Sequence, residues 1–524
     1  MQESGENTST VDVVIVGGGH NGLTAAAYLS KAGKSVLLLE RSDHLGGASV
    51  SAEAFPGMGA RLSRYSYLVS LLPQQIIDDL GLHIELARRR YSSFTPKPGT
   101  DVGLLIDHGD AEATRASFER IGAAADVEGW DRLYSRTGHL AQALWPSVTG
   151  PLPRRSDVRE LIGDDSIMRD FIERPLGDVI EASIADDLVR GVVLTDGLIS
   201  TYAAAHDADL QQNICFLYHV IGGGTGDWDV PVGGMGAVSG ELERAARDGG
   251  ADLRTETTVT SVDNSSVQWR DCSGAKSRAN AGHVLWAAAP GALDDLMGTH
   301  RSPSEGAQVK VNLLLSRLPK LRDSSVSPEA AFGGTFHINE TYTQLEIAYQ
   351  AALSGDLPTP IPAEIYCHSI TDPSILSPEL QDSGAHTLTV FALHAPDRLL
   401  EGADNDAERD RFERAVLDSL SSVLSEPIED AVMRTLDGEL CIETKTTRDL
   451  QEALNMPGGN IFHGPLSWPF AEDDENLPDA AARWGVRSAY EGVLLAGAGS
   501  RRGGGVSGLG GYHAARAVLE SLGE

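Results

Sequence analysis

Cysteine is scarce in this chain. Its 524 residues contain four, and no two of them form a Cys-x-x-Cys pair. Such wide spacing argues against a disulfide framework, a zinc site and a dithiol redox pair. No Ser/His/Asp set and no metal-ligand spacing stands out elsewhere, so the sequence predicts no metal. The four cysteines are Cys215, Cys272, Cys367 and Cys441.

Long apolar runs and positive charge are also lacking. No stretch reaches the roughly 20 apolar residues needed to cross a bilayer, and 75 acidic against 42 basic residues give a net charge of −33. This excess disfavours nucleic acid and anionic lipid as partners. Residues 1–10 carry two acids and no base, unlike a secretory or mitochondrial leader. We therefore expect a soluble, cytoplasmic protein with no nucleic-acid partner and at most peripheral membrane contact.

Aromatic residues are few, at 6%, but apolar residues reach 41% of the chain. A chain of this length and composition can bury a substantial core and exceeds one ordinary domain, so we expect two domains. The apolar run 65–72 could touch lipid, although a buried strand or helix is the favoured interpretation.

The most informative feature is a glycine-rich turn between an apolar strand and a helix. Residues 11–22 read Val-Asp-Val-Val-Ile-Val-Gly-Gly-Gly-His-Asn-Gly, the opening of a dinucleotide-binding βαβ unit. In this pattern Gly17 makes the tight turn, and Gly19 lets the backbone approach a pyrophosphate. Gly22 then allows the helix to pack closely on the strand.

The following residues complete the βαβ unit. A helical stretch over 23–31 offers a pyrophosphate its N-terminus, where free N–H groups and the positive dipole end favour an anion. His20 and Asn21 lie in this loop, and we expect His20 to shape it rather than perform chemistry. The strand 36–40 closes on Glu40, which can hydrogen-bond a ribose diol. The sequence therefore predicts a bound dinucleotide.

Two further glycine-rich segments favour FAD over NAD. Directly after the acid, residues 41–47 end in a Gly-Gly pair that is typical of large flavoproteins. Near the other end, an apolar strand runs into a glycine loop over 497–508 and then an apparent helix over 509–522. Such a helix dipole would stabilise the negative charge of a reduced flavin. A second site for NAD(P) is the alternative, disfavoured because Gly499 precedes Ser-Arg-Arg rather than a close Gly-x-x-Gly.

Motifs along most of the chain resemble one family. The chain resembles the phytoene-dehydrogenase-related flavoproteins, most narrowly the pyridine nucleotide-disulphide oxidoreductase domain-containing protein 2 branch, beside carotenoid desaturases and retinol saturase. Two departures stand out: Ala48 replaces the Arg usual in desaturases and amine oxidases, and Arg501-Arg502 replaces a His-Pro pair. The motifs that carry the resemblance lie at 18–29, 45–49, 62–72, 218–220, 228, 231–236, 458–464 and 503–506.

The glycine motifs and this resemblance together imply a set of contacts to non-covalently bound FAD. In related flavoproteins the backbone at the position of Val259 pairs with the adenine edge. The expected cofactor-binding residues are Gly17, Gly19, His20, Asn21, Gly22, Glu40, Arg41, Gly46, Gly47, Ala48, Val259, Gly499, Ser500, Gly505 and Val506.

The expected fold class is α/β. It combines a Rossmann-like FAD-binding domain of the glutathione-reductase/amine-oxidase type, assembled from discontinuous segments, with an α+β substrate domain that has a helical cap. We assign 11–75, 222–300 and 455–524 to the first domain, 76–221 (the cap) and 301–454 to the second, and 1–10 to a flexible tail.

Catalytic candidates are fewer. Alternation along the strand 309–315 separates four apolar side chains from Lys310 and Asn312, so Lys310 could point into a cavity. In amine-oxidase relatives a lysine on the corresponding strand holds a water near flavin N5, but an exposed strand-edge lysine explains the pattern equally well. His463 could act as acid or base near the flavin, although a turn-packing role is favoured.

These observations predict an oxidoreductase that transfers a hydride between flavin N5 and a fairly apolar organic substrate. Oxygen, a quinone or a similar lipophilic compound would accept the electrons, because no separate nicotinamide domain is evident. An amine oxidase and a flavoprotein with mainly an assembly or regulatory role are the alternatives. The substrate, the direction of reaction and the oligomeric state stay open.

Overall fold

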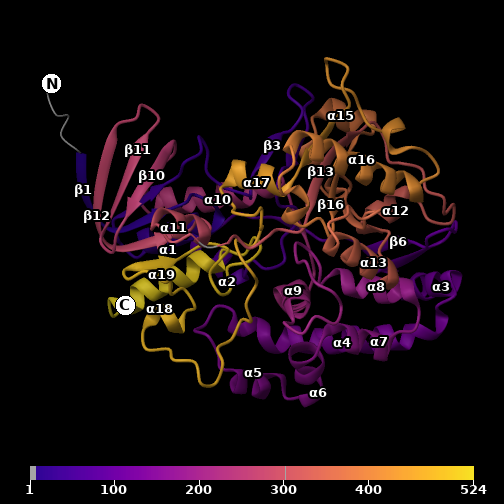
Figure 1. Cartoon of the computed structure of the whole chain (residues 1–524), viewed down its shortest axis with the longest axis horizontal. Coiled ribbons are helices and arrows are strands. Elements are labelled where there is room, and N and C mark those ends of the chain that lie inside the picture. The colour runs from indigo at the N-terminus through magenta and orange to yellow at the C-terminus, as the bar shows by residue number, and fades with distance from the viewer. Residues whose placement is uncertain (1–6, 301) are drawn as a thin grey trace.

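Two seven-stranded sheets organise the chain (Figure 1). The computed structural model describes residues 7–300 and 302–524. The predicted flexible tail over 1–10 is wrong in its last part, since the first strand already begins at Asn7; the rest of that prediction, 1–6, lies outside the described residues. Among the described residues, no helix is both long and apolar enough to cross a membrane.

The first sheet has the order β10-β11-β12-β1-β2-β9, with β18 added beside β12. Its centre is parallel, because β1 pairs in parallel with both β2 and β12. The strands are β1 (Asn7–Val16), β2 (Val36–Leu39), β9 (Asp252–Arg254), β10 (Thr257–Val262), β11 (Ser266–Asp271), β12 (Lys276–Trp286) and β18 (Val493–Leu495).

Burial explains why the central strands read as continuous apolar runs. Residues 13–16 of β1 and all of β2 are buried, as expected for parallel strands with both faces covered. Three helices pack together on this sheet: α1 (His20–Lys31), α10 (Met235–Asp248) and α19 (Leu509–Ser521). The contact between α1 and α19 is very close, because a Cβ at Gly511 would lie 1.8 Å from the carbonyl oxygen of Asn21.

The second sheet has the order β17-β13-β16-β15-β14-β6-β7. The sequence predicts a helical cap over 76–221, but the first part of that segment supplies β6 and β7 to this sheet. The reason is long-range pairing, since β6 joins β14 in parallel. The strands are β6 (Tyr91–Pro96), β7 (Gly103–Asp107), β13 (Val309–Leu315), β14 (Thr335–Ile338), β15 (Ala363–Tyr366), β16 (His386–Ala392) and β17 (Ile442–Lys445).

The remainder of that segment forms a helical layer beside the second sheet, purple to magenta in Figure 1. Its helices are α3 (Ala111–Ile121), α4 (Val127–Leu144), α5 (Arg155–Ile162), α6 (Asp165–Met168), α7 (Leu176–Ser183), α8 (Asp187–Thr195) and α9 (Gln211–Val220). The apolar run 65–72 is neither strand nor helix, although most of it is buried.

The remaining elements connect these layers. The helices are α2 (Gln74–Leu80), α11 (Pro290–Leu296), α12 (Pro328–Phe332), α13 (Tyr342–Leu353), α14 (His368–Thr371), α15 (Pro378–Ser383), α16 (Asn405–Val423), α17 (Thr447–Leu454) and α18 (Ala480–Arg483). Two small two-stranded antiparallel sheets pair β3 (Ser51–Glu53) with β4 (Arg61–Ser63) and β5 (Leu86–Ala87) with β8 (Val230–Pro231).

Candidate functional site

A cavity extends from the glycine turn after β1 to strands β13 and β16 of the second sheet. Most of the residues predicted to bind a cofactor line it, together with both catalytic candidates. They are Gly17, Gly19, His20, Asn21, Glu40, Arg41, Gly47, Ala48, Val259, Gly505, Val506, Lys310 and His463. Gly22, Gly46, Gly499 and Ser500 are not part of the lining and pack behind it.

The glycines of the first turn have separate structural roles. Gly17 adopts a φ of +105°, a conformation that L side chains rarely take. A Cβ at Gly22 would lie 2.0 Å from the carbonyl oxygen of Gly17, so this glycine allows the helix to approach the strand. A Cβ at Gly19 would come no closer than 3.9 Å to any other residue. Gly19 therefore leaves open space for a ligand at the N-terminus of α1.

Glu40 supports the same turn from the end of β2. Its Oε2 accepts a hydrogen bond from the Gly18 amide at 2.7 Å, and its Oε1 accepts one from the Ser42 amide at 2.8 Å. The carboxylate lines the cavity. It therefore sets the shape of the loop, and it lies where the sequence predicts a ribose diol.

Two hydrogen bonds join the glycine loops from opposite ends of the chain. The His20 ring bonds through Nε2 to the Gly505 carbonyl oxygen at 3.1 Å, across 485 residues of sequence. Asn21 donates from Nδ2 to the Gly503 carbonyl oxygen at 3.3 Å. Burial lowers the pKa of His20 to about 4, so this ring is neutral near pH 7. His20 therefore links the first glycine loop to the last.

Lys310 is a buried cavity residue and not a strand-edge lysine. Its strand, β13, has β16 on one side and β17 on the other, so it has no free edge along these residues. The side chain is 1% exposed, and Nζ donates to the carbonyl oxygens of Ser63 at 2.8 Å and Ser66 at 3.2 Å. Nζ also lies 5.0 Å from the centre of the Phe391 ring. Burial lowers the pKa of Lys310 well below its ordinary value.

His463 also lines the cavity, beside the last glycine loop. Its backbone is left-handed, with a φ of +63°. Burial, followed by the nearby His20, lowers the pKa of His463 to about 4. Within the described part of the chain, its buried Nδ1 has no hydrogen-bond partner. A neutral imidazole with a free ring nitrogen can accept a hydrogen bond from a ligand.

The pair Arg501-Arg502 points away from the cavity. Arg502 is buried and donates to the carbonyl oxygens of Ser147 at 3.2 Å and Trp484 at 3.5 Å. Arg501 forms an ion pair with Glu475. Neither arginine belongs to the cavity lining. Arg502 therefore ties the glycine loop to the segment after α4, and Arg501 ties it to the loop that carries Glu475.

An aromatic wall that the sequence does not predict stands between this cavity and a second one. Tyr67 stacks on Tyr366 with ring centres 4.5 Å apart, and its ring lies 4.6 Å from that of Phe391. Trp228 completes the wall on the other side of Tyr67. Trp228 belongs to the motifs that carry the family resemblance. The sequence alone does not show which side chains it contacts, so it could not predict this role.

The second cavity has a volume of about 370 Å³ and shares four lining residues with the first. Its lining includes side chains of the second sheet, of α4 and α8, and of the loop before β8. Several are ionisable. The shared residues are Tyr67, Leu68, His219 and Trp228.

This chain is similar to one family model and to several known proteins. Residues 15–75 match the model of the NAD(P)-binding Rossmann-like domain family. An uncharacterized protein of Mycobacterium tuberculosis (strain H37Rv) is 49% identical over 98% of this chain and 97% of its own length. The rat pyridine nucleotide-disulfide oxidoreductase domain-containing protein 2 is 28% identical over 98% of this chain and 94% of its own length. The chain is therefore homologous to that protein over its full length, as the motifs predict.

A more local match involves one of the subunits of limonene dehydrogenase from Castellaniella defragrans. It is 38% identical over 175 residues, which are 32% of this chain and 29% of that protein.

Among solved structures, a variant of putrescine oxidase matches with a TM-score of 0.58 at 17% identity, over 98% of this chain and all of that one. An oxidoreductase from Methanosarcina mazei matches with a TM-score of 0.55 at 15% identity, over the same shares. These likenesses concern the fold alone. They confirm the expected fold class, an α/β protein with a Rossmann-like dinucleotide-binding domain in the arrangement of amine-oxidase-type oxidoreductases.

Proposed function

The chain belongs to the family of the Mycobacterium tuberculosis protein, and we propose that it is an FAD-dependent oxidoreductase. One observation carries the proposal: two glycine loops from opposite ends of the chain meet on a single cavity, joined by His20 and Asn21. FAD would supply hydride transfer at N5, and the protein would supply binding, orientation and a dry cavity.

The residues present fit a dinucleotide. The open side of Gly19 and the free amides at the start of α1 suit a pyrophosphate. Oδ1 of Asn21 is buried and has no partner among the described residues, so it is available to a ligand donor. We propose that the other predicted cofactor-binding residues that line the cavity also contact FAD. None of the four cysteines lines it, which supports non-covalent binding.

We propose a fairly apolar organic substrate. The cavity walls include many apolar and aromatic side chains, which favour such a compound. The similarity to a subunit of a limonene dehydrogenase, a protein named for a terpene, supports this class. Oxygen or a quinone remains our proposal for the electron acceptor. The apolar lining residues meant here are Leu68, Leu71, Ile199, Phe391, Phe462 and Leu466.

Lys310 and His463 are the proposed proton-handling residues. In the protonated form of Lys310, two Nζ hydrogens engage backbone carbonyls and the third can hold a water in the cavity. Because burial lowers its pKa, this amine can take up or return a proton more readily than an exposed lysine. Because burial keeps the His463 ring neutral, its unpartnered Nδ1 can accept a hydrogen bond from a water or the substrate and so orient the proton that moves.

Amine oxidation is a second candidate, favoured by the second cavity. Tyr67, Trp228 and Tyr366 form an aromatic wall there, and the carboxyl group of Asp196 lines the same space. Aromatic faces and a carboxylate are the groups that bind an ammonium ion.

Purification of the full chain tests the proposal. We expect a yellow protein with about one flavin per chain, which acid or heat denaturation releases as intact FAD. Copurified small molecules are identified by mass spectrometry, and terpenes, other lipophilic alkenes and primary amines are screened for anaerobic bleaching of the flavin. A colourless protein without affinity for FAD contradicts the proposal. Tight FAD that no compound reduces favours the assembly or regulatory alternative.

A further inference from the structure

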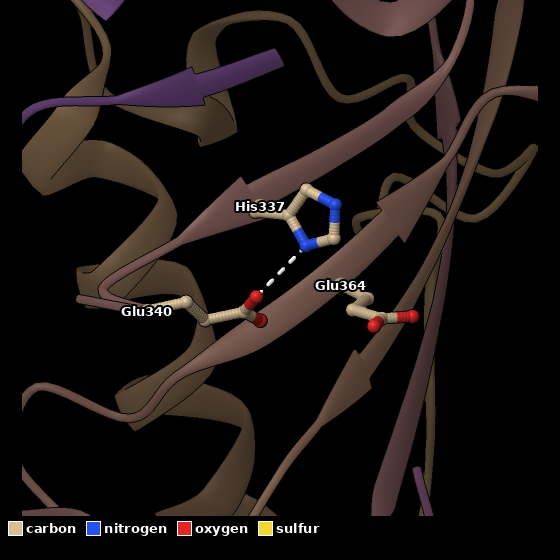
Figure 2. A group of neighbouring side chains, drawn as sticks. All are labelled: His337, Glu340 and Glu364. Atoms are coloured by element: carbon tan, nitrogen blue, oxygen red, sulfur yellow. Dashed lines mark hydrogen bonds and ion pairs between the residues drawn. The ribbon is translucent and has the colours of Figure 1, made fainter. Parts of the chain in front are cut away.

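Three ionisable side chains meet beside the second cavity, away from the glycine loops. His337 lies on β14 and Glu364 on β15, directly opposite each other in the antiparallel register. Cross-strand partners share one face of a sheet, which brings these two side chains together. Glu340 follows three residues after His337, in the loop that leaves β14. Potential ligand atoms of the three residues all lie within 4.8 Å of one another (Figure 2).

All three side chains are withdrawn from solvent: His337 is 5%, Glu340 is 0% and Glu364 is 2% exposed. Nδ1 of His337 bonds to Oε2 of Glu340 at 2.8 Å. Oε1 of Glu340 is buried and has no hydrogen-bond partner in the described part of the chain. In Figure 2 this carboxylate points from its loop toward His337 and the strand that carries Glu364. A buried carboxylate oxygen without a partner is costly unless a ligand satisfies it.

Glu364 is held in place by two hydroxyl groups. Thr195 donates to its Oε1 at 3.0 Å, and Tyr366 donates to its Oε2. The hydroxyl groups fix the orientation of the carboxylate, as outer residues do around metal ligands. Two carboxylates this close in a buried site need a compensating positive charge or a shared proton.

The group is reached from the second cavity, whose lining includes both His337 and Glu364. Asp196 lines the same cavity. An ion bound by the three residues would thus face open space, with a further oxygen nearby. Three protein ligands with an open position are typical of catalytic metal sites.

We propose that His337, Glu340 and Glu364 bind one divalent transition-metal ion of the Zn²⁺ or Mn²⁺ class, with a free coordination position toward the second cavity. One imidazole nitrogen with carboxylate oxygens suits these ions better than Ca²⁺ or Mg²⁺, which prefer oxygen ligands throughout. The ligand atoms need to contract to the spacing set by bonds of about 2.1 Å. Such an ion would polarise an oxygen or nitrogen atom of a bound compound. The site does not depend on flavin binding.

The test uses tag-free full-length protein, stripped with EDTA and dialysed against Zn²⁺ or Mn²⁺. Metal per chain is then measured by plasma mass spectrometry, and affinity by calorimetry. We expect one ion per chain and a rise in the melting temperature with added metal. If neither Zn²⁺ nor Mn²⁺ binds stoichiometrically, the proposal is overturned. The three side chains would then be stabilised by a shared proton.

Near-isosteric variants locate the site. Glu340→Gln and Glu364→Gln keep side-chain volume, and each is expected to weaken metal binding by about tenfold or more, as losses of a ligand commonly do. The matched control is Glu181→Gln, because Glu181 also pairs with a histidine, His206, but at the exposed surface. Circular dichroism checks that each variant folds. Wild-type metal affinity in both folded cluster variants places any bound ion elsewhere and overturns the assignment.

Discussion

At the scale of single residues, Gly19 and Gly22 differ although both belong to one motif. The Cβ of a residue at 19 would point into open cavity, whereas one at 22 would collide with backbone. We therefore expect Gly19→Val to fold normally yet lose flavin, with occupancy falling by about tenfold or more, equivalent to about 1.4 kcal/mol. Absorbance at the flavin bands measures occupancy, and urea unfolding measures stability.

Two controls accompany this variant. Gly22→Val should lower the free energy of unfolding, because its side chain meets the Gly17 carbonyl. Cys272→Ser should change neither property, since this cysteine is exposed. A Gly19→Val protein that stays fully yellow would show that the ligand lies elsewhere.

Lys310 offers a second prediction at this scale. Lys310→Met keeps most of the side-chain volume but removes the amine that holds Ser63, Ser66 and the proposed water. We expect flavin content to persist and reoxidation of the reduced protein by oxygen to slow by about tenfold or more. Stopped-flow absorbance measures the rate. Lys320→Met is the control, because Lys320 is 68% exposed and lies outside the cavity lining.

At the scale of elements, the start of α1 and the loop before α19 act as one unit. Asn21 and His20 tie the first loop to the last, and the two helices touch backbone to backbone at Gly511. We expect Asn21→Ala to weaken flavin binding by about tenfold, because a hydrogen bond of about 1 kcal/mol and a ligand acceptor are lost. Fluorescence of released flavin during dilution measures the dissociation constant.

Gly511→Val provides the contrast. Its side chain would separate α1 from α19, so we expect a loss of folding stability in addition to a loss of flavin. If Asn21→Ala binds flavin as tightly as wild type, the junction between the loops contributes nothing to the site.

At the scale of the whole molecule, buried neutral histidines make stability depend on pH. Burial lowers the pKa of His20 and His463 to about 4, and that of His368 and His394 to about 3. As pH falls below the ordinary value of 6.5, the unfolded chain binds protons at these imidazoles and the folded chain does not. The free energy of unfolding is therefore highest above pH 6.5, and it falls progressively toward pH 4 and below. Urea unfolding at pH 7, 6, 5 and 4 measures this loss.

A single histidine tests the cause. His394 is 1% exposed and adopts a left-handed φ of 51°, which Asn tolerates. His394→Asn should reduce the slope of stability against pH by up to about 1.4 kcal/mol per pH unit. His300→Asn, at a side chain that is 81% exposed, is the control. An unchanged slope in the His394 variant would contradict the role of burial.

Local pattern was enough to predict the dinucleotide-binding turn, because Gly17, Gly19 and Gly22 act within one strand-turn-helix unit. The second glycine loop and the fold class were also readable, since each follows from a short motif and its flanking elements. The flexible tail was wrong at residues 7–10 and the helical cap was wrong at residues 91–96 and 103–107, because long-range strand pairing, not local composition, makes these residues extended.

Neighbours from distant parts of the chain decided the rest. Whether Lys310 faces solvent or a cavity depends on the strands that flank β13, and no pattern inside 309–315 contains that information. The group of His337, Glu340 and Glu364 exists only through the register of β14 with β15. Residues alone set which chemistry is available, and the packing of separate segments set where it is brought together, because burial and pairing act between parts of the chain that are far apart in sequence.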